Sequence, residues 1–235
     1  MVHRCRNRNA ACLFIAGIML LWQASVPARA ADRYFAFVFS SQAKPKFPRF
    51  THVWATIVKA TNTELPPVEW KFQVDTISWY PATLVVHTLR FRAEPGVNLS
   101  LKETIDLVQQ HREHVTVWGP CEVPEFMYVE FLKQKCHLES GAVRYQCIDS
   151  LRDPTIVTDC IHSLTDMDRT RDRSAYPLSR FGDDAAEEIV KVLAKRGRLL
   201  PQDPVSELVF QAMELPCQRV TRRTCTSEGR FPLGR

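Results

Sequence analysis

The first half of the chain carries the hydrophobic patterns of β-strands. Aromatic and small residues alternate over residues 33–40, and β-branched and aromatic residues fill residues 52–58. Such runs predict strands because successive side chains of an extended chain point to opposite faces of a sheet. Two further runs predict strands over residues 70–80, which Pro81 ends, and residues 84–91.

The second half carries the patterns of helices. Residues 92–100 predict a turn, after which Ser100 and Glu103 form a capping box that begins a helix over residues 101–111. Apolar positions predict further helices over residues 124–136, from residue 159 onward, over residues 184–196 and over residues 205–213, with short extended segments at 115–118 and 143–148. Strands followed by helices predict an α+β fold, an antiparallel sheet packed with helices.

The first thirty residues have the composition of an export signal. Three arginines, at positions 4, 6 and 8, precede an apolar run from Ala11 to Trp22 that is too short to cross a bilayer. Ala28-Arg29-Ala30 is a small-x-small cleavage motif. We therefore expect residues 1–30 to be a signal peptide that directs the protein to the periplasm or outside the cell, with an uncleaved anchor as the alternative. No later segment is apolar enough to predict a membrane span.

The expected mature chain is long enough for one domain with a substantial core. We assign residues 31–200 to this domain and residues 201–235 to a C-terminal helix followed by a basic, flexible tail. The charge balance changes once the signal peptide is set aside. The signal peptide contains four of the 31 basic residues and none of the 26 acidic ones, so the remainder is close to neutral. The expected mature chain therefore lacks the excess of positive charge that would favour a nucleic-acid partner.

Six cysteines follow the signal peptide, at positions 121, 136, 147, 160, 217 and 225. In an oxidising compartment, Cys217 and Cys225 could form one disulfide, and two of the first three another. The Cys136-His137 and Cys160-x-His162 spacings do not resemble the paired clusters of structural zinc sites, so we expect no metal and no cofactor. A Gly-rich phosphate loop, a Gly-x-Ser-x-Gly elbow and a His-Glu-x-x-His motif are all missing from the sequence, which argues against nucleotide binding, α/β-hydrolase and zincin chemistry.

One order of residues points to a cysteine hydrolase. His52 opens a predicted strand, and Cys160 lies more than a hundred residues later at a predicted helix start, with Glu94-Pro95-Gly96-Val97, a Val-x-Val strand at 115–117 and Gly141…Tyr145 between them. Over about residues 35–195 this order resembles the circularly permuted NlpC/P60 papain-like hydrolases. The resemblance implies a permuted papain-like fold that acts on amide or ester bonds, with peptides, cell-wall peptides or acyl lipids as substrates. Members often carry an acidic residue soon after the nucleophile, where this chain has Ile161 and His162.

The residue types suit thiol chemistry independently of the resemblance. A helix start and a nearby imidazole are expected to lower the pKa of the Cys160 thiol, and the backbone N–H of Cys160 could donate to an oxyanion. His52 would hold the proton and needs a third residue to fix its tautomer. If Val58 faces Glu69 in a hairpin, Asp75 lies opposite His52, and Glu69 is the reserve candidate because a long loop leaves the register open. We expect a structural role for His162 and a helix-capping role for Asp159.

Two functions from different classes follow. The first is an exported cysteine hydrolase that uses Cys160, His52 and Asp75. The second is a non-catalytic binding or structural protein of the cell envelope with the same fold, in which Cys160 is oxidised or inert.

Overall fold

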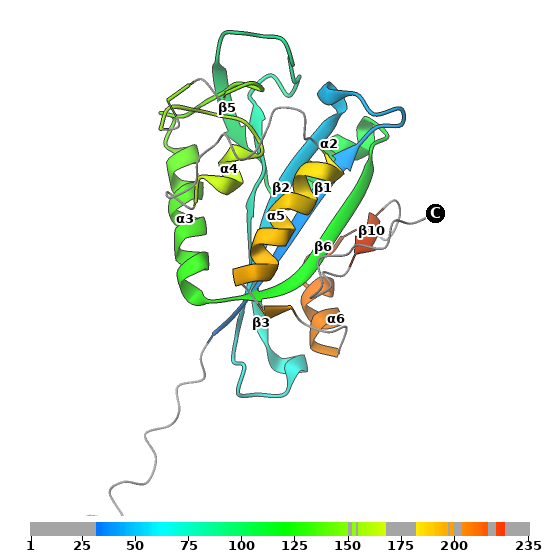
Figure 1. The fold of residues 1–235 in the computed structure, drawn as a ribbon. Coiled ribbons are helices and arrows are strands. Elements are labelled where there is room, and N and C mark those ends of the chain that lie inside the picture. The colour runs from blue at the N-terminus through cyan, green and yellow to red at the C-terminus, as the bar shows by residue number, and fades with distance from the viewer. Residues whose placement is uncertain are drawn as a thin grey trace, which may run out of the picture. The chain divides into compact units, whose positions relative to one another are not determined.

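The computed structural model describes residues 32–149, 152–153, 155–167, 182–196, 198–199, 204–215 and 220–223. The strands of the larger sheet, in chain order, are β1 (Arg33–Gln42), β2 (Thr51–Thr61), β3 (Lys71–Ile77), β6 (His114–Val123), β9 (Arg198–Leu199) and β10 (Val220–Arg223). They form the order β10-β6-β1-β2-β3, and β9 also pairs with β6. All pairs are antiparallel except β10 with β6, which is parallel. Figure 1 shows the long strands β1, β2 and β6 side by side.

A smaller sheet lies beside the larger one. Its strands are β4 (Trp79–Pro81), β5 (Glu94–Asn98), β7 (Arg144–Tyr145) and β8 (Val157–Thr158), in the order β4-β5-β7-β8. β4 and β5 pair antiparallel, whereas β7 and β8 run parallel. Gly96 of β5 is required by close packing, because a Cβ at this position would lie 1.9 Å from a ring carbon of Trp79. This sheet positions the candidate nucleophile, because β8 leads directly into the Cys160 turn.

Helices cover both faces of the large sheet, so that successive side chains of β1, which point to opposite faces, are buried on each side. The helices are α2 (Leu101–Gln110), α3 (Glu125–Glu139), α4 (His162–Thr165), α5 (Asp183–Arg196) and α6 (Pro204–Gln211), with single 3₁₀ turns at Pro48–Phe50 and Pro67–Glu69. Phe35, Phe37 and Phe39 belong to a core with residues of α2 and α6, whereas Ala36 and Val38 belong to a core with residues of α3, α4 and α5. Figure 1 shows α5 lying along β1 and β2.

The α+β class is confirmed, and most predicted elements lie where the sequence placed them. The capping box is also present: Ser100 Oγ accepts from the Glu103 N–H, and the Glu103 carboxylate accepts from the Ser100 N–H. Within the part of the chain that the structure describes, no helix has both the length and the apolar character needed to cross a bilayer. The signal peptide expected over residues 1–30 lies outside the described residues.

Some local predictions are wrong. Residues 84–91 form turns and loop rather than a strand, with Leu84 at a positive φ of 57° and no neighbouring strand to pair with. The turn expected at residues 94–97 is instead part of β5. Part of the tail expected to be flexible, Val220–Arg223, is β10 and pairs with β6. The sheets are therefore mixed rather than wholly antiparallel.

Candidate active site

His52 is enclosed at the beginning of β2. Its side chain is buried, with 2% of the residue exposed. The imidazole ring lies 3.9 Å from the ring centroid of Tyr80 and 5.5 Å from that of Trp54. Such packing restricts rotation of the imidazole ring, so the hydrogen-bond partners of its two nitrogens determine its chemical role.

A chain of hydroxyl groups anchors the imidazole of His52. Nε2 of His52 lies 3.0 Å from Ser78 Oγ, which lies 2.7 Å from Thr104 Oγ1, and Thr104 Oγ1 lies 2.8 Å from the carbonyl oxygen of Ser100. The Thr104 hydroxyl donates toward Ser78 Oγ and toward the Ser100 carbonyl oxygen, whereas Ser78 Oγ and Nε2 of His52 can each donate or accept in the bond between them. These contacts therefore fix the position of the ring through Nε2.

Burial also keeps this imidazole neutral. It lowers the pKa of His52 to about 3, because the charged form would lose its hydration in the protein interior. No carboxylate offsets this effect on the ring. His52 therefore remains an unprotonated acceptor throughout the neutral pH range, unlike an ordinary histidine that titrates near 6.5.

Cys160 lies against the same strand. It occupies the turn between β8 and α4, and α4 begins two residues later, at His162, rather than at residue 159. The backbone N–H of Val53, the residue after His52, donates toward the Cys160 sulfur. The thiol is also close enough to the hydroxyls of Tyr80 and Tyr145 to raise the pKa of each, although burial is the larger cause for both. The fold thus brings Cys160 to the beginning of β2.

The thiol is not activated in the way that the sequence suggested. Burial raises the pKa of Cys160 well above its usual value, and the charges of Asp159, Cys147 and Asp149 raise it further. Only the Val53 N–H opposes this shift. The expected lowering by a helix start fails because α4 has a single turn and two carboxylates lie nearby. The Cys160 thiol and the His52 imidazole are therefore both neutral at rest.

A buried polar cluster holds the Cys160 turn in place. Asp149 Oδ1 lies 2.6 Å from His162 Nδ1, and Asp149 Oδ2 accepts from the Asp159 N–H at 2.8 Å. The Asp159 carboxylate accepts from the N–H groups of Ile161 and His162, which gives it the capping role expected from the sequence. His162 is 2% exposed and has the expected structural role. The donor atoms of Asp149, Asp159 and His162 all lie within 4.8 Å of one another and could hold a metal ion, but these hydrogen bonds already account for their arrangement.

The prediction that Asp75 faces His52 is wrong. The β2–β3 register pairs Val58 with Val74 and Ile57 with Asp75, a shift of five residues from the expected pairing. The cause is the 3₁₀ turn Pro67–Glu69, which delays the start of β3 to Lys71 and leaves the reserve candidate Glu69 exposed in the connection. Asp75 instead accepts from the Tyr128 hydroxyl at 2.8 Å and so ties β3 to α3. Ser78 is the residue at His52 that the sequence analysis missed.

The cysteines that the structure describes are free thiols. They are Cys121, Cys136, Cys147 and Cys160, so the disulfide considered among the first three is not formed. The pair Cys217 and Cys225 lies outside the described residues. Cys147 is close to Cys160, and burial first, then the charges of Asp159 and Asp149, raises its pKa to about 12. Cys136 is exposed on α3 and serves as an internal reference for labelling experiments.

Comparison of the chain with protein-family models, curated proteins and solved structures finds no match. The interpretation of the site therefore depends on its own geometry.

The reactivity of the Cys160 thiol is expected to increase in Asp159→Asn. The negative charge of Asp159 raises the pKa of Cys160, and burial together with Asp149 raises the pKa of Asp159 itself to about 7, so this charge develops mainly above pH 7. Asparagine keeps the oxygen that caps α4 and removes the charge. We expect iodoacetamide to label Cys160 about five- to tenfold faster in this variant at pH 8.

Labelling rates from peptide mass spectrometry, relative to Cys136, would measure this effect. Asp153→Asn is the matched control, because Asp153 is an exposed carboxylate of the same loop. An equal acceleration in both variants would refute the electrostatic explanation.

Proposed function

We propose that this protein is an exported cysteine hydrolase with a circularly permuted NlpC/P60 papain-like fold. Its substrates in this proposal are amide or ester bonds in cell-wall peptides or acyl lipids. The observation that carries the proposal is the position of the Cys160 thiol against the N–H of Val53, directly after the buried imidazole of His52. This contact joins Val53 and Cys160, more than a hundred positions apart in the sequence, and a histidine that precedes the cysteine in the chain supports a permuted enzyme.

The neutral pair supports a mechanism in which the proton leaves the thiol during attack. The sulfur of Cys160 would form a bond to the carbonyl carbon while its proton moves to the unprotonated ring nitrogen of His52. The tetrahedral intermediate, with its oxyanion toward the backbone N–H of Cys160, would expel the amine or alcohol, which takes the proton from His52. Water would then release the acid from the thioester and restore the thiol. Ser78 and Thr104 hold the imidazole through Nε2 and are positioning residues.

Acyl transfer to Cys160 tests this function directly. We expect p-nitrophenyl acetate, or an acyl thioester, to leave an acetyl group on Cys160 of the full chain, detected by peptide mass spectrometry. Cys160→Ser should lose the adduct, and the exposed Cys136 provides the background rate in the same sample. Acylation of Cys160 no faster than that of Cys136 would contradict the proposal. Panels of cell-wall peptides and acyl lipids would then identify the substrate.

A non-catalytic envelope protein is the second candidate, and the raised pKa of Cys160 favours it. A buried thiol with an elevated pKa is typical of structural cysteines, which react slowly. This candidate predicts that Cys160 stays unmodified by acyl donors and that substitution of His52 changes only stability. A disulfide between Cys160 and Cys147 in the isolated protein would likewise support the non-catalytic candidate.

A further inference from the structure

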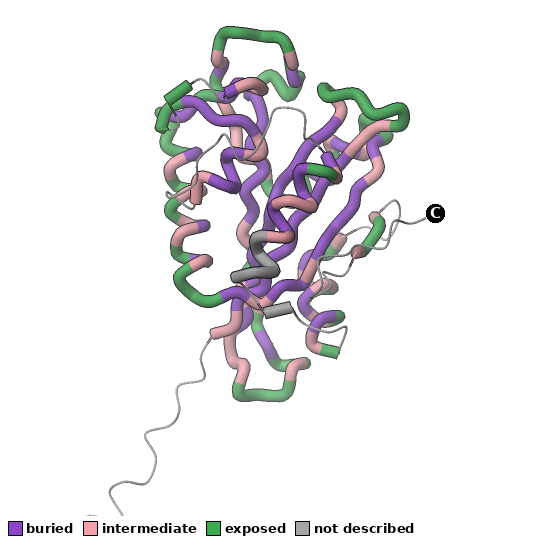
Figure 2. Tube along the Cα trace, in the orientation of Figure 1, coloured by how far each residue is buried: buried purple, intermediate pink, exposed green. Residues whose placement is uncertain are grey.

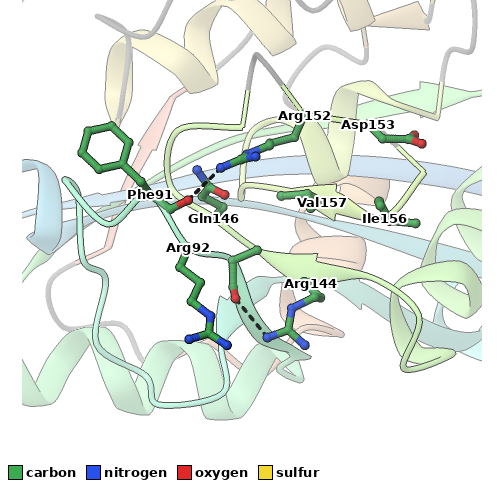
Figure 3. Close-up of a pocket in the computed structure, with 9 residues that line it drawn as sticks. Phe91, Arg92, Arg144, Gln146, Arg152, Asp153, Ile156 and Val157 are labelled. Carbon is green, nitrogen blue, oxygen red and sulfur yellow. Dashed lines mark hydrogen bonds between the residues drawn. The ribbon is translucent and has the colours of Figure 1, made fainter.

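A basic hollow lies on the smaller sheet, apart from the His52 imidazole. It has a volume of about 650 Å³, and its walls come from the loop that precedes β5 and from the segments around β7 and β8. Val157 of β8 is in the wall, three residues before Cys160. Figure 3 shows the side chains around it, with Arg144 and Arg152 reaching toward the backbone of the loop.

Three arginines give the hollow its charge. Nη2 of Arg144 donates to the carbonyl oxygen of Ala93 at 2.9 Å, and Nη2 of Arg152 donates to that of Phe91 at 2.7 Å. These bonds orient both guanidinium groups and occupy only part of their five N–H donors. Arg92 is the third, and Asp153 is the acidic residue in the wall. The local excess of positive charge contrasts with the near-neutral balance of the chain after residue 30.

Gln146 adds a polar group that lacks a partner. It lines the hollow, is 5% exposed, and donates from Nε2 to the carbonyl oxygen of Ile148 at 2.8 Å. Its Oε1 is buried and accepts no hydrogen bond from the part of the chain that the structure describes. Buried acceptors are normally satisfied, so a ligand with a hydroxyl donor suits this position. Arginines and a lone acceptor together fit a group that carries both negative charge and hydroxyls.

Exposed apolar side chains lie in the wall of the hollow and in the loop that supplies part of it. Phe91 and Ile156 line the hollow and are 77% and 50% exposed. Leu89 and Val85, in the same loop as Phe91, are 79% and 53% exposed. Figure 2 colours much of this loop, at the top of the view, as exposed residues. A cluster of exposed apolar residues marks an interaction surface, and arginines among them suit the boundary between lipid headgroups and acyl chains.

We propose that this surface docks on an anionic phospholipid layer, with a glycerophosphate headgroup in the hollow. The phosphate binds Arg92, Arg144 and Arg152, and a glycerol hydroxyl donates to Gln146 Oε1. Leu89 and Phe91 enter the acyl region beside the headgroup. The inference is independent of the proposed hydrolase activity, since it requires neither Cys160 nor His52.

Vesicle sedimentation of the full chain tests the docking. We expect binding to vesicles of phosphatidylcholine with about 30% phosphatidylglycerol to be at least tenfold stronger than to phosphatidylcholine alone, and to weaken with salt. Leu89→Ser combined with Phe91→Ser should reduce partitioning about tenfold. Arg92→Gln and Arg144→Gln should each reduce it about fivefold. Each variant is compared with the parent chain, so any contribution of residues 1–31 cancels.

Two exposed apolar residues elsewhere provide the controls. Val68 is 81% exposed in a 3₁₀ turn and Phe126 is 63% exposed on α3, so Val68→Ser and Phe126→Ser should leave binding unchanged. Loss of binding in these controls, or equal binding to both vesicle types, would overturn the proposal. Binding of soluble glycerol 3-phosphate without vesicle binding would contradict the lipid proposal and indicate a free ligand. Self-association that Leu89→Ser abolishes, without vesicle binding, would contradict it and indicate a second copy of the chain.

Discussion

Replacing His52 with alanine is expected to slow acylation of Cys160 by about 10²- to 10⁴-fold, the usual contribution of a general base. The reason is the high pKa of the thiol, which leaves almost no thiolate at neutral pH. An acceptor for the thiol proton is therefore needed in the transition state, and the neutral imidazole of His52 has one unprotonated ring nitrogen. Stopped-flow measurement of p-nitrophenol release would give the rate.

The pH dependence identifies the mechanism. Since burial lowers the pKa of His52 to about 3, the imidazole is already deprotonated at pH 5, and the acylation rate should show no inflection near 6.5. Iodoacetamide labelling of the same thiol needs the thiolate and should increase up to pH 9. Ser78→Ala should reduce acylation less than His52→Ala, because it leaves the base and removes only its orientation. An inflection near 6.5, or acylation unchanged in His52→Ala, would contradict this assignment.

The long strands β1 and β2 follow from the sequence because each is a nearly continuous run of apolar and small residues, as expected of strands buried on both faces. Residues 33–42 form a strand buried on both faces, and the capping box begins α2 as expected. Residues 84–91 are rich in the residue types that favour strands, as residues 33–42 are, but no neighbouring strand pairs with them. Leu89 and Phe91 are therefore exposed in a loop. Propensity records the fit of a side chain to a sheet, whereas a strand also requires a partner that only the tertiary fold supplies.

Half of the candidate site was accessible from the sequence. The order of His52 and Cys160 led us to expect both at one site, and the structure places the Cys160 sulfur against the N–H of Val53, the residue after His52. Prediction of the third residue depended on the register between β2 and β3. The turn Pro67–Glu69 shifts this register by an odd number of residues, so Asp75 lies on the opposite face of the sheet from the one expected. A signal for Ser78 did exist: it is a lone small polar residue within the apolar run Ile77-Ser78-Trp79-Tyr80. The raised thiol pKa could not be predicted, because it arises from burial and from carboxylates gathered by the fold.

Replacing Asp149 with alanine is expected to lower the free energy of unfolding by about 3–5 kcal/mol, because it leaves two buried N–H donors without their acceptor, at about 1–3 kcal/mol each. Asp149 is fully buried and contacts both the His162 ring and the Asp159 backbone, so the substitution removes two acceptor contacts from the Cys160 turn. Urea unfolding, followed by the fluorescence of buried tryptophans such as Trp54 and Trp79, would show a midpoint lowered by about 2 M for an m-value near 2 kcal/mol/M. Asp149→Asn keeps one acceptor oxygen and should be affected less.

The exposed pair of Lys102 and Asp106 on α2 is the matched control. Its oxygen and nitrogen are 2.6 Å apart, the same distance as in the pair of Asp149 and His162, but both side chains face solvent. Water and salt screen such a pair, so Asp106→Ala should leave the urea midpoint almost unchanged. The two variants therefore differ in burial and not in contact distance. If Asp149→Ala shifted the midpoint no more than Asp106→Ala, the buried cluster would not be what stabilises the Cys160 turn.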